Sequence, residues 1–220
     1  LQKTQTRNPN IPERTYHEQS IIKYTKQLRE IQEQLPAFTR QFFIAIDQTT
    51  AARTRVAYAT DLKNFFEYIQ LNYKAYSDIE IVDFPLHLLT DLKAEDFEQY
   101  IQYLKLYSDK NGNDVINHER SIKRKLSALR CMYQYFHKNK IINENPILQV
   151  SMPKLHDKAI IRFDEDETAN FLDEVESGSQ LTKKQKEFHE KNGIRDLAIL
   201  TLMLGTGIRV SECVGLDIQD

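Results

Sequence analysis

Arg209 directly follows a glycine-rich turn, a position from which an arginine side chain could bind an anion. The turn, Gly205 to Gly207, comes after the apolar stretch 195–204. A guanidinium carries a planar fork of N–H donors that matches phosphate or carboxylate oxygens, and a rigid turn would fix its direction. Glu212, three residues later, is within reach to orient it. Judged on these residues alone, an ordinary surface ion pair is the simpler interpretation.

Positive charge is concentrated on a stretch that has the pattern of an amphipathic helix. Between His118 and Ile142 there are seven lysines and arginines and a single acid, Glu119. Apolar residues at helical spacing predict a helix over 117–139 with a cationic face opposite its core-facing stripe. Such a face fits the major groove of DNA, where cations meet phosphates and polar heads reach base edges. A solvated helix face is the competing interpretation. The candidate DNA-contacting residues here are Arg120, Lys123, Arg124, Ser127 and Arg130.

Arg53, Thr54 and Arg55 form a smaller cationic group at the expected start of another helix, 51–72. The N-terminus of a helix favours a phosphate through its free backbone N–H groups and its dipole, and hydroxyl and guanidinium donors add to this. If the group stands alone, Thr54 acting as a helix cap or facing solvent is the better explanation.

The sequence predicts neither a metal nor an organic cofactor. None of the six histidines has a partner at the spacing of a zinc site, and Gly205 to Gly207 lacks the flanks of a dinucleotide fingerprint or a phosphate-binding loop. The two cysteines, Cys131 and Cys213, have no spacing typical of a disulfide framework, and we expect reduced thiols. The eleven tyrosines fall on amphipathic stretches, and none lies beyond Tyr135.

A mainly helical framework is expected to position these residues. Almost every periodic stretch has helical spacing, and none shows the sustained alternation of a half-buried strand. Asp91 is the expected cap of the helix at 92–107. The expected helices cover about 15–34, 36–47, 51–72, 92–107, 117–139, 165–176 and 195–204, with another starting at Val210. Their expected buried stripes are Tyr58, Leu62, Phe65 and Ile69; Phe97, Ile101 and Leu104; and Ile122, Leu126, Leu129, Tyr133 and Phe136.

Two folded units joined by a linker are expected. The chain has 220 residues, of which 40% are hydrophobic and 28% charged, an ordinary globular composition. Asn145-Pro146 is expected to end the first series of helices, and the polar stretch that follows is predicted to be an extended linker. The expected division is an arm at 1–14, a helical DNA-binding domain at 15–148, a linker at 149–160 and a second domain at 161–220. In the last, 177–191 should be an exposed excursion and 195–204 a buried helix.

Charge and hydropathy restrict the class of protein further. The net charge of −2 argues against a uniformly basic nucleic-acid binder, so any DNA contact must use local patches. No stretch approaches the roughly 20 apolar residues of a membrane span, and the first residues lack the apolar core of a signal peptide. We therefore expect a cytoplasmic protein with no membrane partner.

Four stretches, taken in order, resemble the tyrosine recombinase (phage integrase) family. Residues 205–212, Gly-Thr-Gly-Ile-Arg-Val-Ser-Glu, with Arg-Asp-Leu-Ala-Ile-Leu before and Val-Gly-Leu-Asp after, look like the segment that holds the family's first catalytic arginine. Residues 54–66 resemble its "T…Y…DL..F" helix, and 122–136 its "I.R.LSALR..Y.YF" helix. Asn145-Pro146 and Pro153-Lys154 resemble its linker. The resemblance covers 36–220 and is nearest to the Xer recombinases that act as a single protein in streptococci and relatives, with integrases of conjugative elements as the alternative.

This resemblance implies a fold, a reaction and roles for residues. The implied fold is mainly α, a helical SAM-like core-binding domain followed by the N-terminal part of a mixed α/β catalytic domain. The implied reaction is site-specific DNA recombination or integration through a 3′-phosphotyrosine intermediate, without a cofactor. Arg209 would be catalytic at the attacked phosphate, with Glu212 beside it. The partners would be a double-stranded recombination half-site and other protomers, as a tetramer on paired sites. The residues expected on DNA are Arg53, Thr54, Arg55, Arg120, Lys123, Arg124, Ser127, Arg130 and Lys154.

The family's other catalytic residues have no match in these 220 residues. A lysine on a β-hairpin, a His-x-x-Arg box, a late His or Trp and the nucleophilic tyrosine would follow Asp220. The chain is thus expected to be a DNA-binding piece of a longer enzyme, inactive alone. Two other classes stay open, a non-catalytic DNA-binding regulator of the same architecture and an all-α protein-interaction module. A steep salt dependence of DNA binding would exclude the module, because phosphate contacts release counterions.

Overall fold

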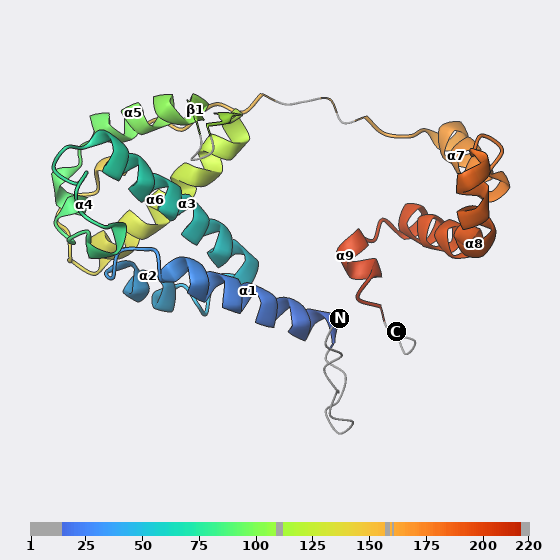
Figure 1. Ribbon diagram of the computed structural model, residues 1–220, viewed down its shortest axis with the longest axis horizontal. Helices are drawn as coiled ribbons and strands as arrows, with labels where there is room; N and C mark the ends of the chain where they lie inside the picture. The colour runs from blue at the N-terminus through green and yellow to red at the C-terminus, as the bar shows by residue number, and fades with distance from the viewer. Residues whose placement is uncertain (1–14, 109–111, 157–158, 160, 217–220) are drawn as a thin grey trace, which may run out of the picture. The chain divides into compact units, whose positions relative to one another are not determined.

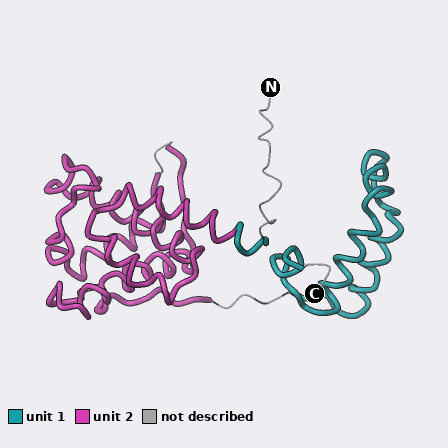
Figure 2. Tube along the Cα trace, turned by 90° about the horizontal axis from the view of Figure 1, so that it is seen from below, with its two compact units in different colours: residues 1–19, 157–220 teal, residues 20–156 magenta. Residues whose placement is uncertain are grey.

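The computed structural model describes residues 15–108, 112–156, 159 and 161–216, and its regular elements are nearly all helices (Figure 1). The chain divides into two compact units (Figure 2). Residues 20–156 form the first, here called the helical unit. Residues 15–19 group with the helices after residue 157 in the second, although the helix that begins at Tyr16 continues into the helical unit. The mainly α fold class expected from the sequence is confirmed.

The helical unit is assembled from helices that follow one another through short connections, with a small hairpin before the last long helix (Figure 1). Most lie within about three residues of the ranges expected from hydrophobic spacing, which is the usual uncertainty at helix ends. Its elements are α1 (Tyr16–Gln32), α2 (Thr39–Ala45), α3 (Ala52–Asn72), η1 (Ile81–Asp83), α4 (Leu88–Asp91), α5 (Ala94–Lys105), β1 (Leu106–Ser108), β2 (Asp114–Ile116), α6 (Glu119–Lys138) and η2 (Pro146–Leu148).

The long helices α3 and α6 pack against each other and carry the centre of the core. The expected stripe of α6, residues 122 to 136, is buried at all five positions, with exposed fractions of 3% or less. On α3, Leu62, Phe65 and Ile69 are equally buried, whereas Tyr58 lies partly at the surface. Hydrophobic spacing therefore identified the packed face of both helices.

Aromatic rings fill much of the space between α3, α5 and α6. Phe65 of α3 stacks on Phe97 of α5 with ring centroids 5.8 Å apart and meets Tyr100 edge-on at 5.1 Å. Phe97 in turn meets Tyr133 of α6 edge-on at 5.3 Å. Such pairs add about 0.5–1.5 kcal/mol each beyond the area they bury. These ring contacts therefore stabilise the packing of α5 against both α3 and α6.

Two tyrosine hydroxyls fasten the end of α3 to the elements that follow. Tyr73 donates to Asp96 Oδ1 at 2.6 Å, and Tyr76 donates to Asp91 Oδ2 at 2.9 Å. Burial and the hydrogen bond to Asp91 raise the pKa of Tyr76 to about 12. Asp91 was expected to cap α5, and this prediction is wrong, because Asp91 is the last residue of α4. Asp96 accepts from the backbone N–H of Lys93 instead and closes the first turn of α5.

The antiparallel hairpin of β1 and β2 was not expected from the sequence. Leu106 pairs with Ile116 and Tyr107 with Val115. Each strand has only three residues, too few to produce a recognisable alternation, and the helical spacing of α5 runs on into β1. Gly112, in the connection, has φ +80°, a value that glycine adopts without the strain of a side chain.

The second unit contains α7 (Glu165–Ser177), α8 (Lys183–Thr206) and α9 (Val210–Cys213). Asp164 and Glu167 cap the start of α7 reciprocally, each side chain accepting from the other residue's backbone N–H at 2.7 and 3.0 Å. His189 of α8 connects α8 to α7, since its Nε2 lies 2.8 Å from the carbonyl oxygen of Val175 in α7.

Two expectations for this unit are wrong. Residues 183–191 were placed in an exposed excursion, but they form the first turns of α8, because Thr182 caps the helix and lysine, glutamine and glutamate are good helix formers. The stretch 195–204 was expected to be a buried helix, yet Ile199 and Leu202 are each 39% exposed and Leu204 is 42% exposed. A helix that is apolar on most sides needs neighbours on all of them, and α8 packs here on α7 and α9.

Candidate nucleic-acid interface

One face of α6 carries the cationic and polar residues predicted from the sequence. Positions 120, 123, 124, 127 and 130 recur every three or four residues, so they line one side of the helix. Arg120 and Arg124 are exposed, and Lys123, Ser127 and Arg130 are partly exposed. The buried stripe on the opposite side fixes the rotation of the helix in the fold, so this face must point outward. We call these five residues the α6 face.

A buried carboxylate of α3 lies directly beneath the α6 face. Asp61 has no exposed surface, and its Oδ2 accepts from Arg124 Nη1 at 2.5 Å. Lys125 Nζ lies 3.5 Å from Oδ1, an ion-pair distance longer than a good hydrogen bond. Asp61 lies three residues after Tyr58 and four before Phe65, on the buried face of α3. Sequence reasoning missed it because the search for a buried stripe counted only apolar residues. Its place in the "DL" pair of the family motif was the one available signal.

This cluster of Asp61, Arg124 and Lys125 is electrostatically unusual. Burial raises the pKa of Asp61, and the attraction of Arg124 and Lys125 offsets only part of that rise. Burial likewise lowers the pKa of Lys125. Lys125 was counted in the positive charge of this stretch, but its side chain is only 7% exposed and faces the protein interior. It therefore balances Asp61 and does not belong to the outward-facing charge.

Besides Arg124, two more candidates on the α6 face have partners within the protein. The Ser127 hydroxyl donates to the carbonyl oxygen of Lys123, one turn earlier, at 2.8 Å. Arg130 Nη2 donates to the carbonyl oxygen of Val150 at 2.6 Å. Val150 is 2% exposed, and Met152 packs against the core. The first residues of the linker expected at 149–160 therefore lie on the helical unit, while Lys154 is exposed.

The group at the start of α3 is only partly available to a ligand. Arg53 and Thr54 are exposed in the first turn. Arg55 instead forms an ion pair with Asp47 and has a side chain only 13% exposed. Ala51 occupies the N-cap position without a side-chain hydrogen bond, so the alternative of Thr54 as the cap does not apply. First-turn N–H groups with no capping side chain are the donors that bind phosphate at a helix N-terminus.

Arg209 and Glu212, the residues expected to work together in the second unit, are in contact. Gly207, with φ +69°, ends α8 in the left-handed conformation, and Arg209 is the N-cap of α9. Its backbone N–H donates to Glu212 Oε2 at 2.9 Å, and its Nη1 donates to Oε1 at 3.0 Å. These hydrogen bonds lower the pKa of Glu212. The Arg209 side chain is 80% exposed, so its remaining donors face outward.

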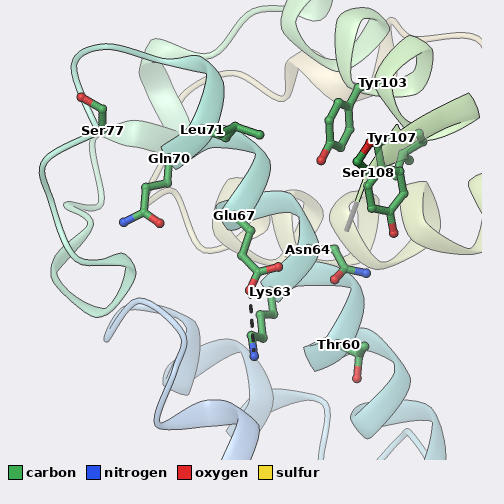
Figure 3. A pocket seen from close by; sticks show the side chains of 11 residues that line it. Thr60, Lys63, Asn64, Glu67, Gln70, Leu71, Ser77, Tyr103, Tyr107 and Ser108 are labelled. Atoms are coloured by element: carbon green, nitrogen blue, oxygen red, sulfur yellow. Dashed lines mark ion pairs between the residues drawn. The ribbon is translucent and has the colours of Figure 1, made fainter. Parts of the chain in front are cut away.

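A broad groove of about 1020 Å³ between α3 and the region of α5 and β1 was not foreseen (Figure 3). Lys63 and Glu67 pair across one turn of α3 at 4.0 Å, and the rings of Tyr103 and Tyr107 stack 5.0 Å apart on the other side. The lining pairs no nucleophile with a base, which gives no reason to propose chemistry there. No group of side chains in the described part of the chain could hold a metal ion, and no helix there is long and apolar enough to cross a membrane.

The chain is similar to curated tyrosine recombinases. It is 32% identical over 190 residues to tyrosine recombinase XerS of Streptococcus equi subsp. equi, a match covering 76% of this chain and 52% of the relative. It is 27% identical over 216 and 219 residues to XerS of Streptococcus mutans and Streptococcus thermophilus, covering 89% of this chain and 60% of each relative. The chain thus spans between half and three fifths of the relatives' length. No family model matches the chain, and no solved structure matches it.

Proposed function

Since this chain belongs to the tyrosine recombinase family, we propose that it is the DNA-binding portion of an enzyme of site-specific DNA recombination. One structural observation, the cationic face of α6, is the main support for DNA binding by this chain. The α6 face presents Arg120, Lys123 and Arg124 on the outside of a helix whose opposite stripe is completely buried. A rigid cationic helix face of this kind suits the major groove of double-stranded DNA.

The structural environment suggests different tasks for the candidate residues. Arg120, Lys123 and the exposed Arg53, Thr54 and Lys154 would contact phosphates, which position the protein without reading sequence. Arg124 would reach a phosphate or a base edge from the centre of the α6 face. Arg124 would do so with the donors that its pairing with Asp61 leaves available. Three other candidates also have partners within the protein and would have to exchange them or use their remaining donors: Ser127, Arg130 and Arg55.

Arg209 would act at the phosphate that is cut. In the proposed reaction a tyrosine hydroxyl oxygen attacks phosphorus, a 3′-phosphotyrosine bond forms, and the 5′ oxygen of the next nucleotide leaves with a proton. The non-bridging oxygens gain charge in the transition state, and a guanidinium already held by Glu212 can stabilise them without reorganising. Because none of the eleven tyrosines lies beyond Tyr135, we infer that the chain alone binds DNA without forming this adduct. Assembly of protomers as a tetramer on paired sites, in the cytoplasm, completes the proposal.

Salt-dependent binding to DNA tests the proposed function. Affinity for a short mixed-sequence duplex should fall steeply with salt, and Lys123→Ala should reduce the slope of log affinity against log salt by about one. Lys26→Ala, which removes an exposed lysine from α1, is the matched control and should leave the slope unchanged. Weak binding with no salt slope would refute the proposal and favour a protein-interaction module.

A further inference from the structure

Asp61 occupies a position that an ionised side chain rarely tolerates. It lies in the packed contact between α3 and α6 with no exposed surface. An unpaired carboxylate there would cost several kcal/mol, so it must be compensated by partners inside the protein. The compensation comes from two consecutive residues of α6, 63 and 64 positions later in the chain, Arg124 and Lys125.

These two cations relate to the surface in different ways. The Lys125 side chain is 7% exposed and ends in the interior, so it supplies charge balance. The Arg124 side chain is 48% exposed, although its Nη1 reaches the buried carboxylate. A guanidinium carries five N–H donors in a rigid plane, so pairing through one nitrogen leaves donors on the others. Arg124 therefore joins a fixed point in the core to the solvent side of the α6 face.

We propose that Asp61 is a positioning residue for DNA binding: it holds the guanidinium of Arg124 so that its outward donors are preorganised for a phosphate or base edge on the α6 face. This inference rests on the proposed function. A free arginine on a helix must lose rotamer freedom when it binds, which costs affinity, whereas an arginine anchored in the core has lost it already. The planar fork also fixes the direction of the remaining donors.

Because Asp61 is negatively charged, the direction in which its replacement changes the affinity for DNA distinguishes the possible roles of this residue. Replacing Asp61 with asparagine removes a negative charge beneath a DNA-binding face, so an effect of net charge alone would tighten binding. Loss of positioning would weaken it. A purely structural role would lower the unfolding temperature and leave the affinity of the folded protein unchanged.

The experiment measures affinity for a short mixed-sequence duplex by fluorescence anisotropy, with the full chain, at a temperature where circular dichroism shows every variant folded. Lys125→Met serves as the background, because Asp61→Asn alone would leave a buried cation unpaired. In that background Asp61→Asn should weaken binding about threefold to tenfold, the cost of immobilising one long side chain. After Arg124→Ala, the same Asp61→Asn change should have no further effect.

A second variant keeps the test valid if the buried substitutions do not fold. Arg124→Lys changes a half-exposed residue, keeps the charge and loses the fork, so it should weaken binding by a similar factor. Unchanged or tighter binding with Asp61→Asn, additive effects of Asp61→Asn and Arg124→Ala, or unchanged binding with Arg124→Lys would each overturn the inference. In those cases the salt slope and the Lys123→Ala effect would persist, whereas failure of the proposed function would remove both.

Discussion

Replacing Arg130 with methionine is expected to release the first residues of the linker from the helical unit. Arg130 Nη2 donates to the carbonyl oxygen of Val150 at 2.6 Å, which joins α6 to the chain just beyond η2. Methionine keeps most of the apolar stem of arginine and removes the donor, so the change isolates the hydrogen bond from the packing.

The size of the effect follows from the type of hydrogen bond. A hydrogen bond from a charged group contributes roughly 1.5–3 kcal/mol net, and each 1.4 kcal/mol changes an equilibrium about tenfold. Arg130 Nε is buried without a partner among the described residues, and its removal relieves part of that loss. We therefore expect the lower end of the range, an increase of about tenfold in local opening of residues 149–152.

Limited proteolysis with thermolysin, which cuts before apolar residues, measures this opening. The bonds before Val150 and Met152 become available only when the segment detaches, while the bond before Leu155, which is 40% exposed, serves as an internal reference. When opening is fast, the cleavage rate follows the open population. The ratio of cleavage before Val150 to cleavage before Leu155 should rise about tenfold in Arg130→Met. Arg130→Lys keeps one donor nitrogen, so its cleavage ratio should lie between those of the wild type and Arg130→Met. Equal ratios in wild type and Arg130→Met would refute the reasoning.

Three further predictions concern catalysis, pH and buried charge. In a full-length protein that has the proposed recombinase activity, Arg209→Lys should bind DNA normally and cleave on the order of 100-fold more slowly or worse, and wild-type levels of trapped adduct on a nicked substrate would contradict this. Unfolded tyrosine ionises near pH 10 while folded Tyr76 keeps its proton to about pH 12, so urea-measured stability should fall as pH rises through this window, and less steeply in Tyr76→Phe. Asp61→Leu should cost about 3–5 kcal/mol alone, and Asp61→Leu with Lys125→Met should be neutral or stabilising, as urea unfolding would detect.

Local pattern predicted the helices well and their tertiary partners poorly. The buried stripe of α6 could be predicted from the sequence because its apolar residues recur every three or four positions within a single helix. The burial of Asp61 could not, because the cations that make it tolerable lie more than sixty residues away, on a helix whose crossing point no local pattern encodes.

The second unit also shows that local sequence patterns do not determine tertiary contacts. An apolar run at 195–204 predicts burial, but burial also requires other elements to cover the helix, and that information is not local. The capping residues Asp164 and Thr182, by contrast, act within one turn and explain where α7 and α8 begin. For Arg209 and Glu212, three-residue spacing was enough to predict their contact.

The distribution of tyrosines gives this protein an optical signal that comes almost entirely from the helical unit. The chain has eleven tyrosines and no tryptophan, and the last tyrosine, Tyr135, lies in α6. Ten of the eleven tyrosines, all except Tyr16, lie in the helical unit, so intrinsic fluorescence and near-ultraviolet dichroism at tyrosine wavelengths report mainly on that unit. Far-ultraviolet dichroism, in contrast, reports all helices, including α7 and α8. A single unlabelled sample followed at both wavelengths would thus reveal whether the second unit melts before, with or after the helical unit.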